Sequence, residues 1–176
     1  MIRIFDLLIS FLGLIILSPF LIFFFLILKY ETKHPFFIQK RVGKNMKPFF
    51  LIKFRTMKED TISIATHLTD KNSITKIGLF LRKYKIDELP QLLNVFKGDM
   101  SLVGPRPCLY NQYDLIKFRE ELNVFSVRPG ITGLAQIKNI DMSQPKFLSE
   151  IDSKMINEFN LYIYFKLIFI TILNII

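Results

Sequence analysis

The sequence predicts a membrane-anchored α+β fold that is mostly helical and contains one small β-hairpin. An apolar stretch near the N-terminus, from Leu7 to Leu28, is long enough to enter a bilayer. Two short runs of alternating apolar and basic residues flank a turn at Gly43, as expected for a hairpin. Further along, apolar residues recur at helical spacing, most clearly from Ile77 to Ile86.

The apolar stretch from Leu7 to Leu28 would reach roughly 33 Å as a straight helix, enough to cross a membrane. Pro19 lies in its middle and should bend the helix, and Ser18 can bond a carbonyl that the proline leaves free. Two readings follow: a plain spanning helix that tolerates the proline, or a re-entrant helix whose ends stay on one face. Basic residues at both ends fit the second reading, namely Arg3, Lys29, Lys33, Lys40 and Arg41. We assign residues 1–30 to this anchor and residues 31–176 to the domain that follows it.

Phe36 to Val42 and Phe49 to Phe54 are predicted to be the two strands of the hairpin. Many basic residues occur here, and the simplest interpretation is a solvated hairpin above anionic lipid. A more specific interpretation places Lys53 and Arg55 near a phosphorylated ligand.

The remaining segments are assigned more briefly. We predict loop and short helix for Lys58–Thr75, and an amphipathic helix on the core or at the membrane interface for Leu109–Asn123. Residues Ile140–Glu150 are expected to be irregular, with Asp152 opening the last element. Asn160–Ile176 is very apolar but short for a second crossing, so we expect a helix packed on the domain or at the interface.

The composition restricts the possible partners and ligands. Lys and Arg number 24 against 15 acidic residues, and the net charge of +9 favours nucleic acid, anionic membrane or phosphorylated ligands. The single cysteine, Cys108, excludes an internal disulfide, and we interpret it as a packing residue. His34 and His67 do not show metal-ligand spacing.

The stretch from Lys85 to Pro107 holds the strongest candidates for chemistry. Asp87 and Glu88 are adjacent and precede Pro90, a residue that favours a helix start. Arg106 lies between two prolines, and its planar guanidinium suits phosphate oxygens. Each feature alone is more often structural, an acidic helix cap or a stiffened loop. Together they favour metal-assisted phosphoryl transfer.

A second arginine made rigid by proline occurs at Arg128-Pro129-Gly130. Gly130 and Gly133 would permit close approach of the backbone to a ligand. We therefore interpret Arg128 as part of a phosphate site.

These motifs, in this order, resemble the bacterial sugar transferases, specifically the small monotopic polyprenyl-phosphate phosphoglycosyl transferases. The resemblance covers nearly the whole chain, and its segments are Ser18-Pro19, Gln39–Gly43, Lys53–Met57, Leu81–Lys83, Asp87–Leu92, Gly98–Pro107 and Arg128–Gly133. The chain departs from the family pattern at Lys138–Asp141, at Tyr164 and in having no Trp.

The resemblance implies that a sugar-1-phosphate moves from a UDP-sugar to polyprenyl (undecaprenyl) phosphate, releasing UMP and starting glycan assembly. It implies Asp87 as the nucleophile that carries a covalent phosphosugar, and Glu88 as a ligand of Mg²⁺. It also implies a re-entrant helix broken at Ser18 and Pro19. The active site would face the cytoplasm on the bacterial inner membrane. We expect substrate phosphates to be bound by Lys53, Arg55, Arg82, Arg106 and Arg128.

The expected partners are a UDP-sugar, polyprenyl phosphate and membrane lipid, and the sequence is compatible with a homodimer. A different class of function also fits the charge: a non-catalytic basic membrane protein that binds nucleic acid or anionic lipid. Against it, acids and glycine–proline turns interrupt the basic residues, and no nucleic-acid motif occurs, so we expect no nucleic-acid partner. Release of UMP from a UDP-sugar distinguishes the two.

Overall fold

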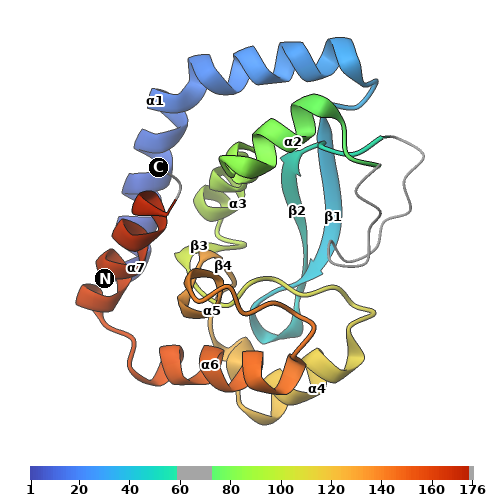
Figure 1. Cartoon of the computed structure of the whole chain (residues 1–176). Helices are drawn as coiled ribbons and strands as arrows, with labels where there is room; N and C mark the ends of the chain where they lie inside the picture. The colour runs from blue at the N-terminus through green and yellow to red at the C-terminus, as the bar shows by residue number, and fades with distance from the viewer. Residues whose placement is uncertain (59–72, 175–176) are drawn as a thin grey trace.

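The computed structural model describes residues 1–58 and 73–174. Most of the segment Lys58–Thr75, predicted above as loop and short helix, lies outside the described residues. The helices are α1 (Ile2–Glu31), α2 (Lys76–Lys83), α3 (Gln91–Lys97), α4 (Tyr113–Glu121), α5 (Leu134–Ile137), α6 (Pro145–Asn157) and α7 (Leu161–Leu173). The strands are β1 (Phe36–Val42), β2 (Pro48–Phe54), β3 (Ser101–Val103) and β4 (Gly130–Thr132). The architecture is therefore mostly helical with two small sheets, as predicted (Figure 1).

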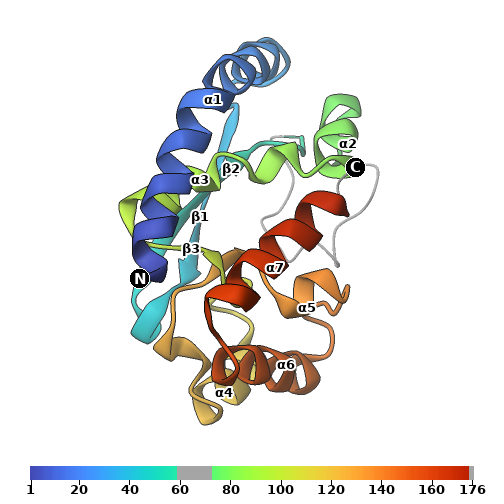
Figure 2. The ribbon, with the colours of Figure 1, turned by 90° about the vertical axis from the view of Figure 1, so that its left-hand side faces the viewer.

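The apolar N-terminal stretch forms one long helix, α1, which is apolar and long enough to cross a membrane by length and composition. Figures 1 and 2 show that it changes direction part-way along. Pro19 has no N–H to offer the carbonyl of Ile15, and the hydroxyl of Ser18 donates to that carbonyl at 2.7 Å. The expected proline bend and its compensation by serine are both confirmed.

The first turns of α1 are bonded to the domain. Arg3 donates to the carbonyls of Val95 (2.6 Å) and Phe96 (2.9 Å) in the last turn of α3. Asp6, only 2% exposed, accepts hydrogen bonds from the Ser101 hydroxyl, the Leu102 N–H and the Tyr164 hydroxyl. A buried carboxylate therefore joins α1 to β3 and α7.

The last turns of α1 contact the same domain at a different place. Phe24 is buried and stacks on Phe80 of α2, and the Thr75 hydroxyl donates to the Glu31 carboxylate at 3.3 Å. Both ends of the long helix therefore pack on one body.

The predicted hairpin is confirmed. Strands β1 and β2 pair antiparallel, with Phe36 opposite Phe54 and Val42 opposite Pro48. Asn94 of α3 fixes β2 from the side, because its amide accepts from the Ile52 N–H and donates to the Phe50 carbonyl. The hairpin and the helix that follows the two acids thus form one rigid unit.

The second sheet was not predicted. Strands β3 and β4 are parallel, pairing Ser101 with Gly130 and Val103 with Thr132. Gly130 and Gly133 each lie against the backbone of Gly104, and Gly130 also lines a cavity, so their predicted approach to a ligand stays a prediction. Because glycine has no side chain, the segment from Gly130 to Gly133 can lie in contact with the backbone of Gly104.

Gly130→Ala should therefore destabilise the fold by about 2–3 kcal/mol, because the new methyl group would overlap the Gly104 backbone. Thermal unfolding of the detergent-solubilised chain measures this. Gly13→Ala is the matched control. Gly13 lies inside α1, and the methyl group of an alanine there would meet only the end of the Leu92 side chain. Equal melting temperatures for the Gly130 variant and the parent would contradict the close approach.

The C-terminal third differs from the prediction at two points. Residues 140–150 were expected to be irregular, but α6 begins at Pro145, whose fixed φ suits the first helical turn. Asp152 does not open the last element; it lies inside α6 and forms a buried ion pair with Arg119 of α4. The helix predicted over Leu109–Asn123 forms as α4, which is shorter than predicted. The apolar helix predicted for the C-terminal segment forms as α7, and it packs on the domain through Tyr164 and Leu167.

Candidate active site

Asp87 and Glu88 lie in a short 3-10 turn, Ile86–Glu88, that links α2 to α3. Asp87 is 6% exposed. Glu88 is half-buried and forms an ion pair with Arg106, with 2.7 Å between its Oε1 and the guanidinium nitrogen. Pro90 caps α3 and Gly98 ends it in the left-handed region, so the turn has a rigid helix on its C-terminal side. The two acids are thus held at a fixed corner between helices.

Burial raises the pKa of Asp87 to about 6, and the neighbouring charge of Glu88 adds to the rise. Lys53, Arg82 and Arg106 oppose it, which places these three cations near the carboxylate. At neutral pH a carboxyl group with a pKa of about 6 is mostly ionised, and an ionised carboxylate can act as a nucleophile. The surroundings of Asp87 therefore suit covalent chemistry.

The predicted phosphate-binding residues divide into two groups. Lys53, Arg82 and Arg106 come together around the acids, with Arg82 also donating to the Thr56 hydroxyl at 2.8 Å. Arg55 and Arg128 have other partners. Arg55 donates to the His34 carbonyl at 2.8 Å, and Arg128 donates to the Gly98 carbonyl at 2.7 Å, at the end of α3.

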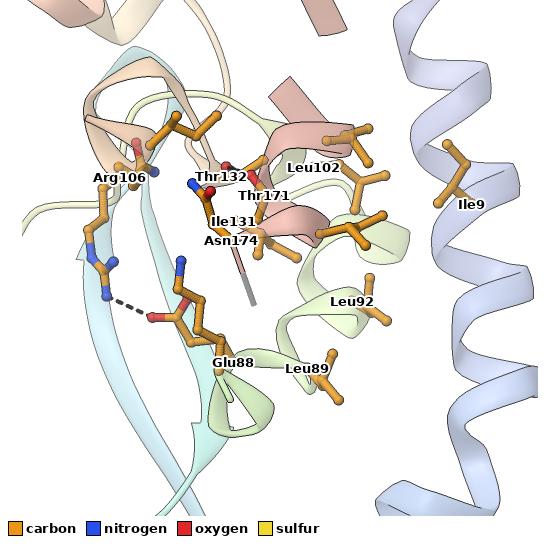
Figure 3. Close-up of a pocket in the computed structure, with 15 residues that line it drawn as sticks. Ile9, Glu88, Leu89, Leu92, Leu102, Arg106, Ile131, Thr132, Thr171 and Asn174 are labelled. Atoms are coloured by element: carbon orange, nitrogen blue, oxygen red, sulfur yellow. Dashed lines mark hydrogen bonds and ion pairs between the residues drawn. The ribbon is translucent and has the colours of Figure 1, made fainter. Parts of the chain in front are cut away.

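A cavity of about 180 Å³ opens beside Glu88, and we call it the apolar pocket (Figure 3). Most of its lining is aliphatic and comes from α1, α3 and the residue before its cap, β3, β4, α5 and α7, namely Ile9, Leu89, Leu92, Leu102, Ile131, Ile137, Ile168 and Ile172. Figure 3 shows the Glu88–Arg106 pair at one end and Ile9 of α1 at the other. The apolar pocket therefore has one charged end.

A second cavity of about 440 Å³, the polar pocket, shares the Glu88–Arg106 pair with the first. Its lining includes four cations and two acids, Arg41, Lys53, Lys85, Arg106, Glu88 and Asp141. Asp87 lines neither cavity, so Glu88 is the acid that faces both. A polar ligand and an apolar ligand could thus meet at one charged point.

Among the residues that line the polar pocket but were not assigned to the site from sequence, two have a buried side-chain atom without a hydrogen-bond partner in the described part of the chain. Burial and the nearby charge of Arg106 lower the pKa of Arg41 to about 10, and its Nε is buried with no hydrogen-bond partner among the described residues. Gln136 Oε1 is likewise buried and unpaired within the described part of the chain, and Gln136 lines both cavities. For Arg41 the available signal was the motif Gln39–Gly43, which does not show where a side chain points.

Cys108 is fully buried, and burial raises the pKa of its thiol. The prediction of a packing residue is confirmed. Among the described residues, no group of three or more His, Cys, Asp or Glu side chains could hold a metal ion without other ligands.

A family model described as bacterial sugar transferase matches residues 1–176. The chain is 39% identical over 173 residues to the uncharacterized sugar transferase EpsL of Bacillus subtilis, covering 97% of this chain and 84% of that protein. It is 39% identical over 143 residues to the UDP-glucose:undecaprenyl-phosphate glucose-1-phosphate transferase of Caulobacter vibrioides, covering 78% of this chain and 54% of that protein.

A third relative, from Aeromonas hydrophila, is named UDP-N-acetylgalactosamine-undecaprenyl-phosphate N-acetylgalactosaminephosphotransferase. It is 34% identical over 177 residues, covering 95% of this chain but 41% of its own length. The chain therefore spans about half or less of these two named transferases.

Proposed function

The chain belongs to the bacterial sugar transferase family, and from this we propose that it transfers a sugar-1-phosphate from a UDP-sugar to undecaprenyl phosphate. The products are UMP and a polyprenyl-diphosphate sugar, the starting unit of a glycan. The observation that carries the proposal is that a cation-rich pocket and an aliphatic pocket meet at Glu88 and Arg106. The reaction brings a charged nucleotide sugar and an apolar lipid to the same phosphorus atom, so it needs a cation-rich pocket and an aliphatic pocket side by side.

The polar pocket suits the nucleotide sugar. Arg41, Lys53 and Arg106 line it, and a diphosphate brings negative charge that these cations can compensate. Arg41 is the clearest candidate ligand beyond those expected from sequence, because its Nε is buried without a partner among residues 1–58 and 73–174 and Arg106 lies close by. An anion bound between them would relieve both the unsatisfied donor and the repulsion of like charges.

The proposed chemistry uses Asp87 as the nucleophile. A carboxylate oxygen of Asp87 attacks the sugar-linked phosphorus, the bond from that phosphorus to the UMP oxygen breaks, and UMP leaves. An oxygen of the lipid phosphate then attacks the same phosphorus, and the bond to Asp87 breaks. Because Asp87 is buried and lines neither pocket, its carboxylate must become accessible before it can attack the phosphoryl group.

The residues present fit Mg²⁺ as a cofactor. Magnesium in phosphoryl transfer commonly uses one or two carboxylates and takes its other ligands from water and substrate phosphates. Glu88 faces both pockets, and its ion pair with Arg106 engages Oε1. We propose Glu88 as the ligand on the protein, where a bound Mg²⁺ would neutralise charge on the diphosphate.

Glu88→Gln should therefore raise the Mg²⁺ concentration needed for half-maximal activity by roughly tenfold, because a neutral amide is a weaker ligand. A magnesium titration of initial rates, with and without this substitution, measures the change. Glu121→Gln is the control, because this substitution removes the same charge at an exposed position on α4. Superimposable titrations would remove Glu88 from the metal site.

We further propose a monotopic protein of the bacterial inner membrane with its active site on the cytoplasmic face. The support is that both ends of the apolar helix α1 pack on the same domain, through Asp6 near the start and Phe24 near the end. A helix that crossed the bilayer completely could not keep both contacts.

Cysteine labelling tests this topology. Ile4→Cys and Lys33→Cys, made singly in a Cys108→Ser background, should both react with an impermeant thiol reagent only from the cytoplasmic side. Both positions are exposed, so access does not depend on unfolding. Labelling of Ile4→Cys from the outside would establish a spanning helix instead.

The proposed activity is tested by incubating the solubilised chain with undecaprenyl phosphate, Mg²⁺ and each of a panel of UDP-sugars. We expect UMP release with one or a few of these sugars, and dependence on the lipid for continued turnover. If no UDP-sugar yields UMP, the proposed function fails, and a non-catalytic role in binding anionic lipid becomes the better account.

A further inference from the structure

Lys85 lines both the apolar and the polar pocket, and it lies immediately before the turn that carries Asp87 and Glu88. Arg106 is the other cation that lines both cavities, but it is paired with Glu88 at 2.7 Å. None of the described acidic residues forms an ion pair with Lys85. Lys85 is therefore the uncommitted cation at the charged end of the apolar pocket.

The backbone of Lys85 has an unusual conformation. Its φ of 54° and ψ of 21° lie in the left-handed region, directly after the end of α2. Glycine or asparagine normally occupies such a position, because a β-carbon is unfavourable there. Two backbone hydrogen bonds fix the corner, from Lys85 N–H to the Arg82 carbonyl and from Glu88 N–H to the Lys85 carbonyl, both at 3.2 Å.

The end of α2 accounts for the left-handed backbone at residue 85 but not for the choice of lysine, since glycine would fit better. The position of the Lys85 side chain, at the charged end of the apolar pocket, offers a reason for the lysine. An ammonium group placed at the charged end of an aliphatic cavity, beside the Glu88–Arg106 pair, suits the head of an amphiphilic anion. The chain of such a molecule would lie among Leu89, Leu92 and Ile172, with its phosphate toward Lys85.

We propose that Lys85 binds the phosphate of the lipid acceptor and that it selects this substrate, not the nucleotide sugar. The inference rests on the proposed function. In the first transfer Arg41, Lys53 and Arg106 serve the diphosphate of the donor, and in the second Lys85 orients the lipid phosphate toward the phosphorus atom. Lys85 thereby distinguishes the two half-reactions.

Lys85→Gly tests the proposal most sharply, because it removes the ammonium group and also relieves the backbone. The melting temperature should stay equal to that of the parent or rise. The KM for undecaprenyl phosphate should rise by roughly tenfold, as expected for loss of one charged hydrogen bond, while the KM for the UDP-sugar stays within about twofold. Loss of a purely structural residue would not raise the KM for the lipid while leaving the KM for the UDP-sugar unchanged.

Lys85→Gln and Lys83→Gln form a matched pair with the same loss of charge. Lys83 lies two residues away at the end of α2, over the Tyr84 ring, and lines neither pocket. Lys85→Gln should reproduce the rise in the lipid KM, and Lys83→Gln should not. Equal effects of the two substitutions would show a general loss of attraction to the anionic substrate and would overturn the proposal.

Binding of undecaprenyl phosphate without any donor separates this inference from the proposed function. The lipid should raise the melting temperature of the parent and of Lys83→Gln more than that of Lys85→Gly. If the parent releases no UMP but shows this difference, the proposed function fails and the Lys85 site stands. An unchanged lipid KM, a raised donor KM alone, or no lipid-induced shift in the parent would overturn the site.

Discussion

Asp87→Asn is expected to lower the turnover rate by roughly three orders of magnitude or more, because the amide has the shape of the carboxylate but is not a nucleophile. The fold should survive. Burial and Glu88 raise the pKa of Asp87, so the folded protein holds the charged form at a cost that the neutral amide avoids. Rates of UMP release and thermal unfolding, measured on the same preparation, check both expectations.

The neighbouring acid supplies the comparison for this result. Glu88 is more accessible than Asp87 and lines both pockets, so exposure alone would favour it as the nucleophile. Asp87→Asn should abolish turnover at every Mg²⁺ concentration, whereas Glu88→Gln should regain part of its rate at high Mg²⁺. Activity in the Asp87 variant together with complete loss in the Glu88 variant would exchange the two roles.

Asp152→Asn should produce the largest loss of stability, about 3–5 kcal/mol, because it leaves the charge of Arg119 buried without its counter-ion. The two side chains are 0% and 2% exposed and lie 2.7 Å apart. The free energy of unfolding, from denaturant titration in detergent, measures the loss. A variant as stable as the parent would show that Arg119 reaches solvent.

A double replacement, Arg119→Met with Asp152→Leu, is the informative control. Removing both charges together and filling their space with apolar groups should recover most of the stability. It should not recover full activity. Arg119 also donates to the backbone carbonyl of Arg106 at 2.8 Å, so the double variant loses a support of the arginine that pairs with Glu88.

Local patterns predicted much of the fold because they act over short distances in the chain. Alternation and a turn fixed both strands of the hairpin, and Ser18-Pro19 indicated the bend in α1 together with its compensating hydrogen bond. The parallel pairing of β3 with β4 could not be found in this way. Each strand is three residues long, and the pairing depends on glycines that let distant segments touch.

The same distinction applies to the site. The adjacency of Asp87 and Glu88 is a property of the sequence, but the direction of an arginine side chain is not. An arginine beside proline indicates a rigid backbone, which holds for Arg106 and Arg128 alike. The fold directs Arg106 to Glu88 and Arg128 to the end of α3. Arg41 was missed because its burial beside Arg106 depends on tertiary packing.

Arg3 and Asp6 make the N-terminal helix an integral part of the enzyme, not an exchangeable tether. Grafting an unrelated apolar helix in place of residues 1–30 would leave Ser101 and Tyr164 without their shared acceptor. Trimming the chain to obtain a detergent-free protein should fail for the same reason. A better route to water solubility keeps both residues and replaces exposed aliphatic side chains on the outer face of the helix, such as Leu8, Leu12 and Ile16.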